Sequence, residues 1–211
     1  NFYTSVWNEK ELSQANSDAA DNNTILLFDD SGVLYKKLGS MNNLRVIHIA
    51  SGESFRRIND NSYNVGNSQE DYINLFKDIL DSKISVNRMI VYKSASDYQD
   101  DRESLAHIDM LYNISQSLMS LKYSKEVKLL WVFENLHDDS MAEYYAAGGF
   151  AKSLYMENLR YNYKVIGIDQ ISENLVDVVL SEFETAFDDR EIRYVNSKRY
   201  VRELAVADVT E

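Results

Sequence analysis

The sequence predicts an α/β fold of a truncated Rossmann-like type, in which helices cover both faces of a mostly parallel sheet. Short continuous apolar runs recur along the chain, as in TILLFDD at residues 24–30, and such runs are typical of strands buried on both faces. Segments with helical spacing of apolar residues separate these runs. The alternation favours right-handed βαβ crossovers. Because no repeat, low-complexity tract or long linker interrupts it, we expect residues 1–211 to form a single domain.

The N-terminal part of the chain contains three expected strands and one short helix. Residues 2–7 mix aromatic and β-branched side chains, which favours a strand. Residues 24–30 and 44–50 are the first two buried apolar strands. Residues 31–40 between them predict a short helix with Gly39 near its end, where a left-handed C-cap is favoured.

The following residues, 51–66, predict a small hairpin or extended excursion with its turn at Asn59-Asp60-Asn61. Ser68 then has an acid, Asp71, three residues on, which resembles a capping box and indicates that a helix begins here. Apolar residues follow at helical spacing: Tyr72, Ile73, Phe76, Ile79 and Leu80.

The second half of the chain repeats the alternation. The expected strands are residues 88–95, 127–135 and 163–169, and the expected helices are residues 102–121, 141–158 and 173–187. The chain closes with two strand-like pieces, EIRYV and RYVREL, on either side of Asn196-Ser197, which is a hairpin signal.

Composition and charge exclude several functions. A net charge of −12 repels phosphate backbones, so we expect no nucleic-acid partner. The absence of cysteine removes disulfides, thiolate catalysis and cysteine metal sites. No run approaches the roughly 18 apolar residues that span a membrane, and the N-terminus lacks a secretory signal, so we expect a cytoplasmic protein without membrane contact. Because the chain begins with Asn1, we expect a processed product or a piece of a longer protein.

The glycines do not form a dinucleotide-binding turn. Such a turn needs closely spaced glycines after the first strand, so that the backbone can approach a pyrophosphate at a helix N-terminus. None of the seven glycines are spaced as G-x-G, and the turn after residues 24–30 holds only Gly32. We therefore expect no nicotinamide cofactor and no other cofactor in this chain.

The stretch YYAAGGFAK contains parts of a short-chain reductase site without their spacing. Such reductases use a tyrosine as proton donor, with a lysine or asparagine four residues later. Tyr144 and Tyr145 are followed at that distance by glycines, and Lys152 lies further along. Two other pairs have the spacing, one across the predicted terminal hairpin turn and one in a predicted loop: Tyr194 with Lys198, and Tyr63 with Asn67. Among 15 tyrosines such coincidences are expected, so we interpret them as surface or half-buried tyrosines and expect no catalytic residue.

Acidic and histidine residues give no stronger site. Asp29 and Asp30 end a strand, where α/β proteins place sites, but they lack the Asp-x-Asp spacing of haloacid-dehalogenase-type phosphatases, so we interpret them as a solvated acidic turn. His48, His107 and His137 are far apart, and no cluster has metal-ligand spacing, so no metal site is expected. His48 lies within an expected strand and is interpreted as a satisfied core histidine.

An ordered set of segments resembles a known family. The segments are TILLFDDSGVL, RVIHIASGESFRRINDNSYNVGNSQEDYINLF, LLWVFENL, GGFAKSLYMENLRYNYKVIGID and EIRYVNSKRYVREL. Together they resemble the N-terminal structural subdomain of ketoreductases from bacterial modular polyketide synthases of the trans-acyltransferase type. The resemblance extends from about Val6 to Leu204. The chain departs from the family at turns, for example in having Leu159 where the family often has proline.

The resemblance implies a non-catalytic role in antibiotic biosynthesis within a multienzyme. The structural subdomain braces a downstream catalytic half, which binds NADPH and reduces β-ketoacyl intermediates carried on acyl carrier protein. The expected partners are this catalytic subdomain, other synthase domains and, indirectly, the carrier protein. We expect Gly148 and Gly149 to let their helix pack closely on the sheet, and the candidate packing or interface residues are Tyr145, Gly148, Gly149, Phe150, Leu154 and Glu157.

Two alternatives stay open at this point. The first alternative is a pseudo-ketoreductase scaffold beside another processing domain. The second is an enzyme with an unrecognised site, either a divergent short-chain reductase-like enzyme or a small hydrolase. Saturable NADPH binding by the isolated chain would favour the enzyme.

Overall fold

The computed structural model describes residues 2–12, 23–41, 43–85, 87–94, 103–134, 141–169 and 174–207, without the side chains of residues 103–107. The strands within these ranges are β1 (Tyr3–Glu9), β2 (Thr24–Phe28), β3 (Arg45–Ser51), β4 (Arg56–Asn59), β5 (Ser62–Val65), β6 (Arg88–Lys93), β7 (Val127–Glu134), β8 (Tyr161–Ile168), β9 (Glu191–Val195) and β10 (Lys198–Val206). The helices are α1 (Val33–Leu38), α2 (Gln69–Asp81), α3 (Glu103–Ser120), α4 (Met141–Glu157) and α5 (Leu175–Glu184).

The described strands form one ten-stranded sheet in the order β1-β10-β9-β8-β7-β6-β2-β3-β5-β4. The central pairs, from β5 through β3, β2, β6, β7 and β8 to β9, are parallel. The pairs at the two edges, β4 with β5 and both β9 and β1 with β10, are antiparallel. The prediction of a mostly parallel Rossmann-like sheet is therefore confirmed.

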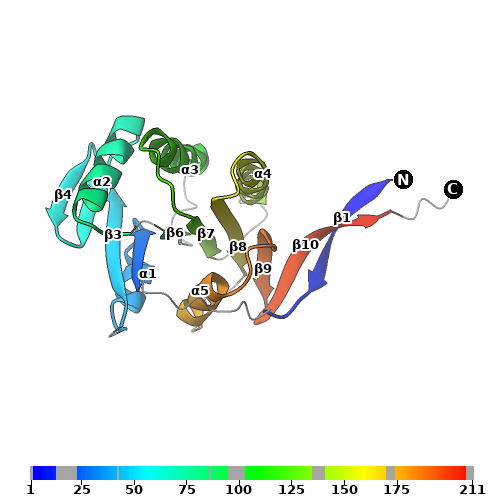
Figure 1. Ribbon diagram of the computed structural model, residues 1–211. Coiled ribbons are helices and arrows are strands. Elements are labelled where there is room, and N and C mark those ends of the chain that lie inside the picture. Colours follow the sequence, from blue (N-terminus) through cyan, green and yellow to red (C-terminus); the bar gives the residue numbers. More distant parts are fainter. Residues whose placement is uncertain are drawn as a thin grey trace.

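Helices cover both faces of this sheet (Figure 1). The helices α2, α3 and α4 lie on one face, and α1 and α5 lie on the other. The strand β2 shows why its sequence is a continuous apolar run: Leu26 and Phe28 belong to the core under α2–α4, whereas Ile25 and Leu27 belong to the core under α1 and α5.

Local signals set most element boundaries. Ser68 caps α2 by accepting a hydrogen bond from the N–H of Asp71, as the sequence predicts. The β4–β5 hairpin turns at Asp60–Asn61, also as predicted. At the closing hairpin, Asn196 and Ser197 have φ of 50° and 64°, the left-handed conformation that a two-residue hairpin turn requires.

Two local predictions are wrong. Gly39 ends α1 in a right-handed conformation (φ −63°), because its N–H continues the helical pattern to the carbonyl of Tyr35. The left-handed glycine is Gly32, with φ of 65°, at the start of the same helix. Tyr63 lies in strand β5 and is buried, where a loop was predicted.

The strands β1 and β10 form a ribbon that projects from the body of the molecule (Figure 1). Residues 198–201 of β10 also pair with β9, whereas residues 202–206 pair only with β1. The described ends of the chain meet at the tip of this ribbon, where the N–H of Ala207 donates to the carbonyl of Phe2 at 2.8 Å. Within the described ranges, no helix is both long enough and apolar enough to cross a membrane.

Candidate functional site

In a dinucleotide-binding fold the pyrophosphate lies at the helix N-terminus after the first parallel strand, and here Asp29 occupies that position. Asp29 follows β2 and is 2 % exposed. Its carboxylate accepts hydrogen bonds from the N–H of Gly32 (2.8 Å), the N–H of Tyr35 (2.9 Å) and the hydroxyl of Ser31 (2.6 Å). Backbone donors that a phosphate would need are therefore engaged by an anion of the chain itself.

The rest of this turn is also tied to the sheet. The carboxylate of Asp30 accepts from both the N–H and the hydroxyl of Ser51, at the end of β3. The Nε2 atom of His48 lies 2.7 Å from the carbonyl oxygen of Asp29, and its ring stacks on Tyr35. The prediction of a solvated acidic turn holds for the exposed Asp30 and is wrong for the buried Asp29. The prediction of a satisfied histidine holds for His48.

The described residues at the carboxyl ends of β2, β3 and β6 leave little space between them. The space among these residues, which include Asp30, Ser51 and Tyr92, is about 10 Å³. That volume is at most enough for one water molecule. Beside it, Lys93 at the end of β6 is buried and pairs at 2.5 Å with the buried Glu143 of α4. Among the described residues, side chains thus occupy most of the space at the ends of β2, β3 and β6, where α/β enzymes often hold their ligands.

The tyrosine hydroxyls that resemble a reductase site have other partners. Tyr144 is fully buried, and its hydroxyl donates to the carbonyl of Ile192 at 2.9 Å. Burial, together with the charge of Glu191, raises the pKa of Tyr144 well above its ordinary value. A catalytic tyrosine needs the opposite shift, towards the working pH. The ammonium of Lys152 pairs with Glu191 at 2.5 Å.

The tyrosines of the two pairs with correct spacing also have other partners. The hydroxyl of Tyr194 donates to Glu182 at 2.8 Å, whereas Lys198 pairs with Glu9 on the ribbon. The hydroxyl of Tyr63 donates to Asp78 at 2.9 Å, and burial with this carboxylate raises its pKa to about 12. His107 and His137 lie outside the side chains that the structure describes.

The residues predicted to pack or to form an interface on α4 divide into two groups. Gly148 is buried against β9, where an added Cβ would overlap the Glu191 carboxylate, so close packing explains this glycine. Gly149 faces open space, so the prediction that it packs on the sheet is wrong. Leu154 is buried in the core and Phe150 packs against its edge, whereas Tyr145 and Glu157 are exposed.

Glu191 connects α4 to the ribbon through two ion pairs. Its buried carboxylate binds Lys152 of α4 and the guanidinium of Arg202 of β10, the latter at 3.0 Å. Arg202 also donates to the hydroxyl of Ser5 in β1 and lies over the ring of Tyr145, 4.4 Å from its centroid. The four elements α4, β9, β10 and β1 are thereby held together.

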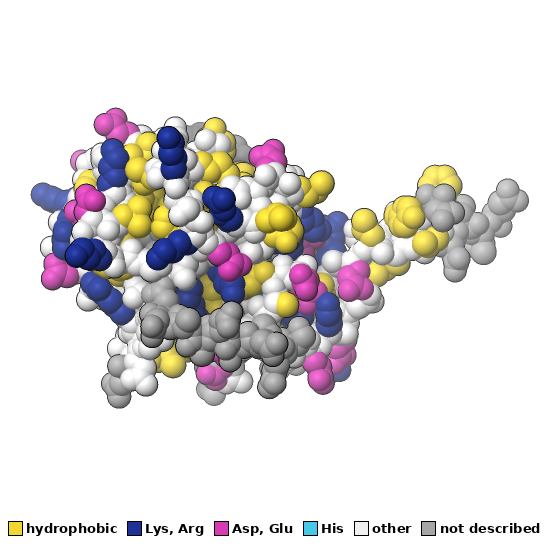
Figure 2. All heavy atoms as spheres, viewed as in Figure 1, with side chains coloured by type: hydrophobic (Ala, Val, Ile, Leu, Met, Phe, Trp, Pro, Cys, Tyr) yellow, Lys and Arg dark blue, Asp and Glu magenta, His cyan; other side chains and the backbone are white. Residues whose placement is uncertain are grey.

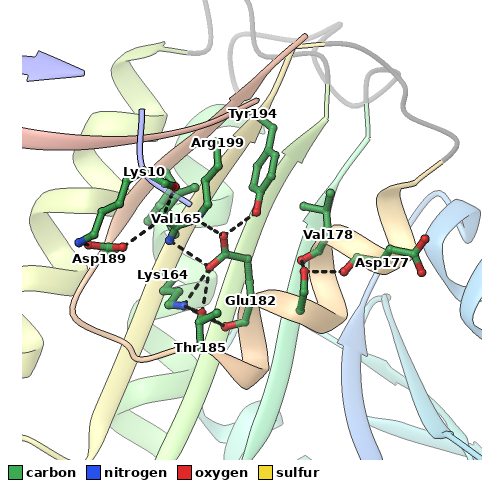
Figure 3. Close-up of polar contacts among 12 residues, drawn as sticks. Lys10, Lys164, Val165, Asp177, Val178, Glu182, Thr185, Asp189, Tyr194 and Arg199 are labelled. Atoms are coloured by element: carbon green, nitrogen blue, oxygen red, sulfur yellow. Dashed lines mark hydrogen bonds and ion pairs between the residues drawn. The ribbon is translucent and has the colours of Figure 1, made fainter. Parts of the chain in front are cut away.

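A larger buried network surrounds Glu182 on the opposite face of the sheet (Figure 3). The Glu182 carboxylate accepts from Lys164 of β8 at 2.9 Å, from Arg199 of β10 at 2.7 Å and from Tyr194 of β9. Arg199 also binds Asp189, which binds Lys10 after β1 at 2.6 Å. Each of these groups has an opposite charge or a hydrogen-bond partner within reach.

The opposite charges in this network counteract the effect of burial on each other's pKa. Burial alone raises the pKa of Glu182, but the hydrogen bond from Arg199 and the charge of Lys164 outweigh it, so the pKa lies below its ordinary value. Burial lowers the pKa of Lys164, and Glu182 opposes this shift. Our sequence analysis missed the network, although a lysine inside the apolar strand YKVIGI was a signal that a buried partner exists.

Comparisons with known proteins place this geometry in context. A family model described as beta-ketoacyl synthase-like, N-terminal, matches residues 23–183. No curated protein matches the sequence.

Solved structures of ketoreductases have the same fold. An N-terminal ketoreductase from the macrolactin assembly line matches with a TM-score of 0.73 and 20 % identity, over 96 % of this chain and 44 % of that chain. An A1-type ketoreductase matches with a TM-score of 0.63 and 11 % identity, over 98 % of this chain and 42 % of that chain.

A multidomain structure also matches. It contains the adenylation, ketoreductase and pseudo Asub domains of a keto acid-selecting NRPS module, and the TM-score is 0.77 at 17 % identity, over 98 % of this chain and 18 % of that chain. The chain therefore spans less than half of the length of each of these three structures. The predicted resemblance to synthase ketoreductases is confirmed in the fold.

Proposed function

Because the chain belongs to the beta-ketoacyl synthase-like, N-terminal family, we propose that it is the non-catalytic structural subdomain of a polyketide synthase ketoreductase. In this role it braces a catalytic half that binds NADPH and reduces β-ketoacyl groups on acyl carrier protein, in a cytoplasmic synthase of the trans-acyltransferase type. The similarity of its whole fold to less than half of each solved ketoreductase supports this assignment.

The observation that carries the proposal is the closed nucleotide turn. Asp29 engages the donors at the start of α1, and the described residues beside it leave space for one water molecule at most. A dinucleotide needs those donors and a far larger cleft. A Rossmann-like sheet without this site retains the packing function of the fold.

The exposed side of α4 offers a surface for such packing. Its exposed positions include apolar or small residues, with Tyr145 and Gly149 exposed and Met156 83 % exposed, beside the charged Lys152 and Glu157. A glycine within a helix costs stability, and no contact inside the described chain offsets that cost at Gly149. Close approach of a neighbouring subdomain at this side accounts for these residues.

The test is an NADPH oxidation assay with a β-ketoacyl thioester surrogate. It compares the 211-residue chain with a longer protein in which the proposed catalytic half is joined after Glu211. We expect activity in the longer protein alone, and no saturable change in NADPH fluorescence with the 211-residue chain.

Two other outcomes contradict the proposal in different ways. Reduction by the 211-residue chain alone would make it an enzyme. Silence of both proteins, each shown to be folded by circular dichroism and a cooperative unfolding curve, would favour a pseudo-ketoreductase scaffold beside another processing domain.

A further inference from the structure

One face of the β1–β10 ribbon carries an apolar strip that no described helix covers. Directly opposite residues on antiparallel strands share a face, so Tyr3 and Val206 lie on the same face as Leu204, which is opposite Ser5. These three apolar side chains are 63 %, 58 % and 75 % exposed, respectively. Figure 2 shows hydrophobic side chains exposed on this projecting part of the molecule.

The strip faces the same side of the sheet as α4. The next residue pair along the ribbon on this face is Trp7 with Arg202. Trp7 packs against the core beneath α4, and its ring lies 6.3 Å from that of Tyr144. The guanidinium of Arg202 lies over Tyr145 of α4. The ribbon therefore extends the sheet beyond α4, and the outer side of α4 lies beside it.

Two ion pairs to one buried carboxylate connect α4 to the ribbon. The carboxylate of Glu191 in β9 binds Lys152 of α4 and Arg202 of β10. Gly148 leaves the space that the Glu191 carboxylate occupies. A surface whose parts are fixed before binding loses less conformational entropy when a partner docks.

We propose that this corner, formed by Tyr3, Leu204 and Val206 with the Tyr145–Arg202 pair, is the docking surface for the reductase subdomain joined in cis after β10. The inference rests on the proposed function and adds the place of contact. Apolar strands with one uncovered face are stabilised when a further layer packs on that face.

The position of the chain ends argues for an occupant in cis. Both described ends lie at the tip of the ribbon, beside the strip, where Ala207 bonds to Phe2. A subdomain joined there is held at an effective concentration on the order of millimolar, far above that of a second copy in solution. An occupant joined at this point therefore competes successfully for the strip.

The experiment measures hydrogen exchange and heat inactivation in the longer protein. The test variant is Leu204→Thr with Val206→Thr, which removes apolar surface and has β-branched side chains, suited to a strand, at both positions. The control is Ile58→Thr, which removes a 50 % exposed isoleucine from β4 at the opposite edge of the sheet. Because these side chains are exposed, all variants of the 211-residue chain are expected to unfold at the wild-type urea concentration.

We expect exchange of the backbone amides in residues 3–9 and 202–206 to be at least about tenfold slower in the longer protein than in the 211-residue chain. The test variant should lose this protection and shorten the half-life of reductase activity at an elevated temperature. The Ile58→Thr control should change neither.

One outcome would overturn the docking surface and leave the proposed function intact: the longer protein is active, and exchange protection and activity half-life are the same in the test variant, the control and the wild type. Concentration-dependent dimers of the 211-residue chain that the test variant abolishes, without extra protection in the longer protein, would replace the cis partner by a second copy. A longer protein without activity and without protection would contradict the proposed function itself.

Discussion

Replacing Glu182 by glutamine tests whether the buried network stabilises the fold. The carboxylate is fully buried and receives hydrogen bonds from Lys164, Arg199 and Tyr194, which come from three different strands. Glutamine has nearly the same shape but no charge, and only its single carbonyl oxygen accepts hydrogen bonds. Glu182→Gln therefore leaves two buried cations facing a neutral group.

The expected loss follows from the lost charge compensation. Arg199 keeps Asp189 as a second partner, whereas Lys164 keeps only neutral acceptors such as the hydroxyl of Thr185. Breaking a buried ion pair by removing one partner costs about 3–5 kcal/mol. For a domain of this size that loss lowers the midpoint of thermal unfolding by about 6–20 °C.

The assay is urea unfolding followed by circular dichroism, with the midpoint and slope fitted separately. The matched control is Glu184→Gln on the exposed side of the same helix, for which we expect a change within about 0.5 kcal/mol. A loss of less than about 1 kcal/mol in Glu182→Gln, with an unchanged slope, would refute the conclusion that Glu182 compensates the buried cations.

Three further predictions concern individual contacts. Gly148→Ala should destabilise the fold by about 1–3 kcal/mol because the added Cβ meets the Glu191 carboxylate. Gly149→Ala, whose added Cβ meets nothing, should stabilise the fold by about 0.5–1 kcal/mol. Equal effects of the two variants in thermal unfolding would contradict the close packing of Gly148 on Glu191. Asp29→Asn should cost about 1–3 kcal/mol by leaving a buried N–H of α1 without its acceptor, and Asp30→Asn, at an exposed site, less than about 1 kcal/mol in urea unfolding. The difference in unfolding free energy between wild type and Glu182→Gln should be constant above about pH 5 and should shrink as the pH falls below about 4. A carboxyl whose pKa is lowered in the folded state stabilises the fold above its unfolded pKa and loses that contribution when it is protonated. A difference that is unchanged at pH 3 would contradict the direction of this pKa shift.

The order of elements was predictable from the sequence because each signal is local. The apolar runs of β2, β6 and β7 are buried on both faces, which leaves a pattern that does not depend on distant residues. Ser68 with Asp71, and Asn196 with Ser197, mark a helix start and a hairpin by the preferences of their own backbone. The absence of a glycine-rich turn was visible for the same reason.

The roles of individual polar residues were not predictable because they depend on partners far along the chain. Glu182 meets Lys164 and Arg199, which are 18 and 17 residues away, only when α5 packs over β8 and the hairpin folds back. The burial of Asp29 follows from the left-handed Gly32, which turns the start of α1 onto its carboxylate. At Gly149 no contact in the described chain explains the residue, so its sequence signal is ambiguous between packing inside the chain and packing outside it.

The hydrogen bonds that stabilise the fold bear on its proposed lack of catalytic activity. Asp29 lies at the turn where a dinucleotide-binding fold holds its pyrophosphate, Lys93 lies at the carboxyl end of β6, and Tyr144 lies on α4; each has a partner within the chain. To serve a substrate or cofactor, such a group must first give up that partner and leave it buried, at about 1–3 kcal/mol for each unsatisfied group. With a total stability of about 5–15 kcal/mol for a domain, two or three such losses would endanger the fold. A subdomain that stabilises a neighbour therefore gains by keeping these groups paired, and the catalytic groups are better placed in the neighbour.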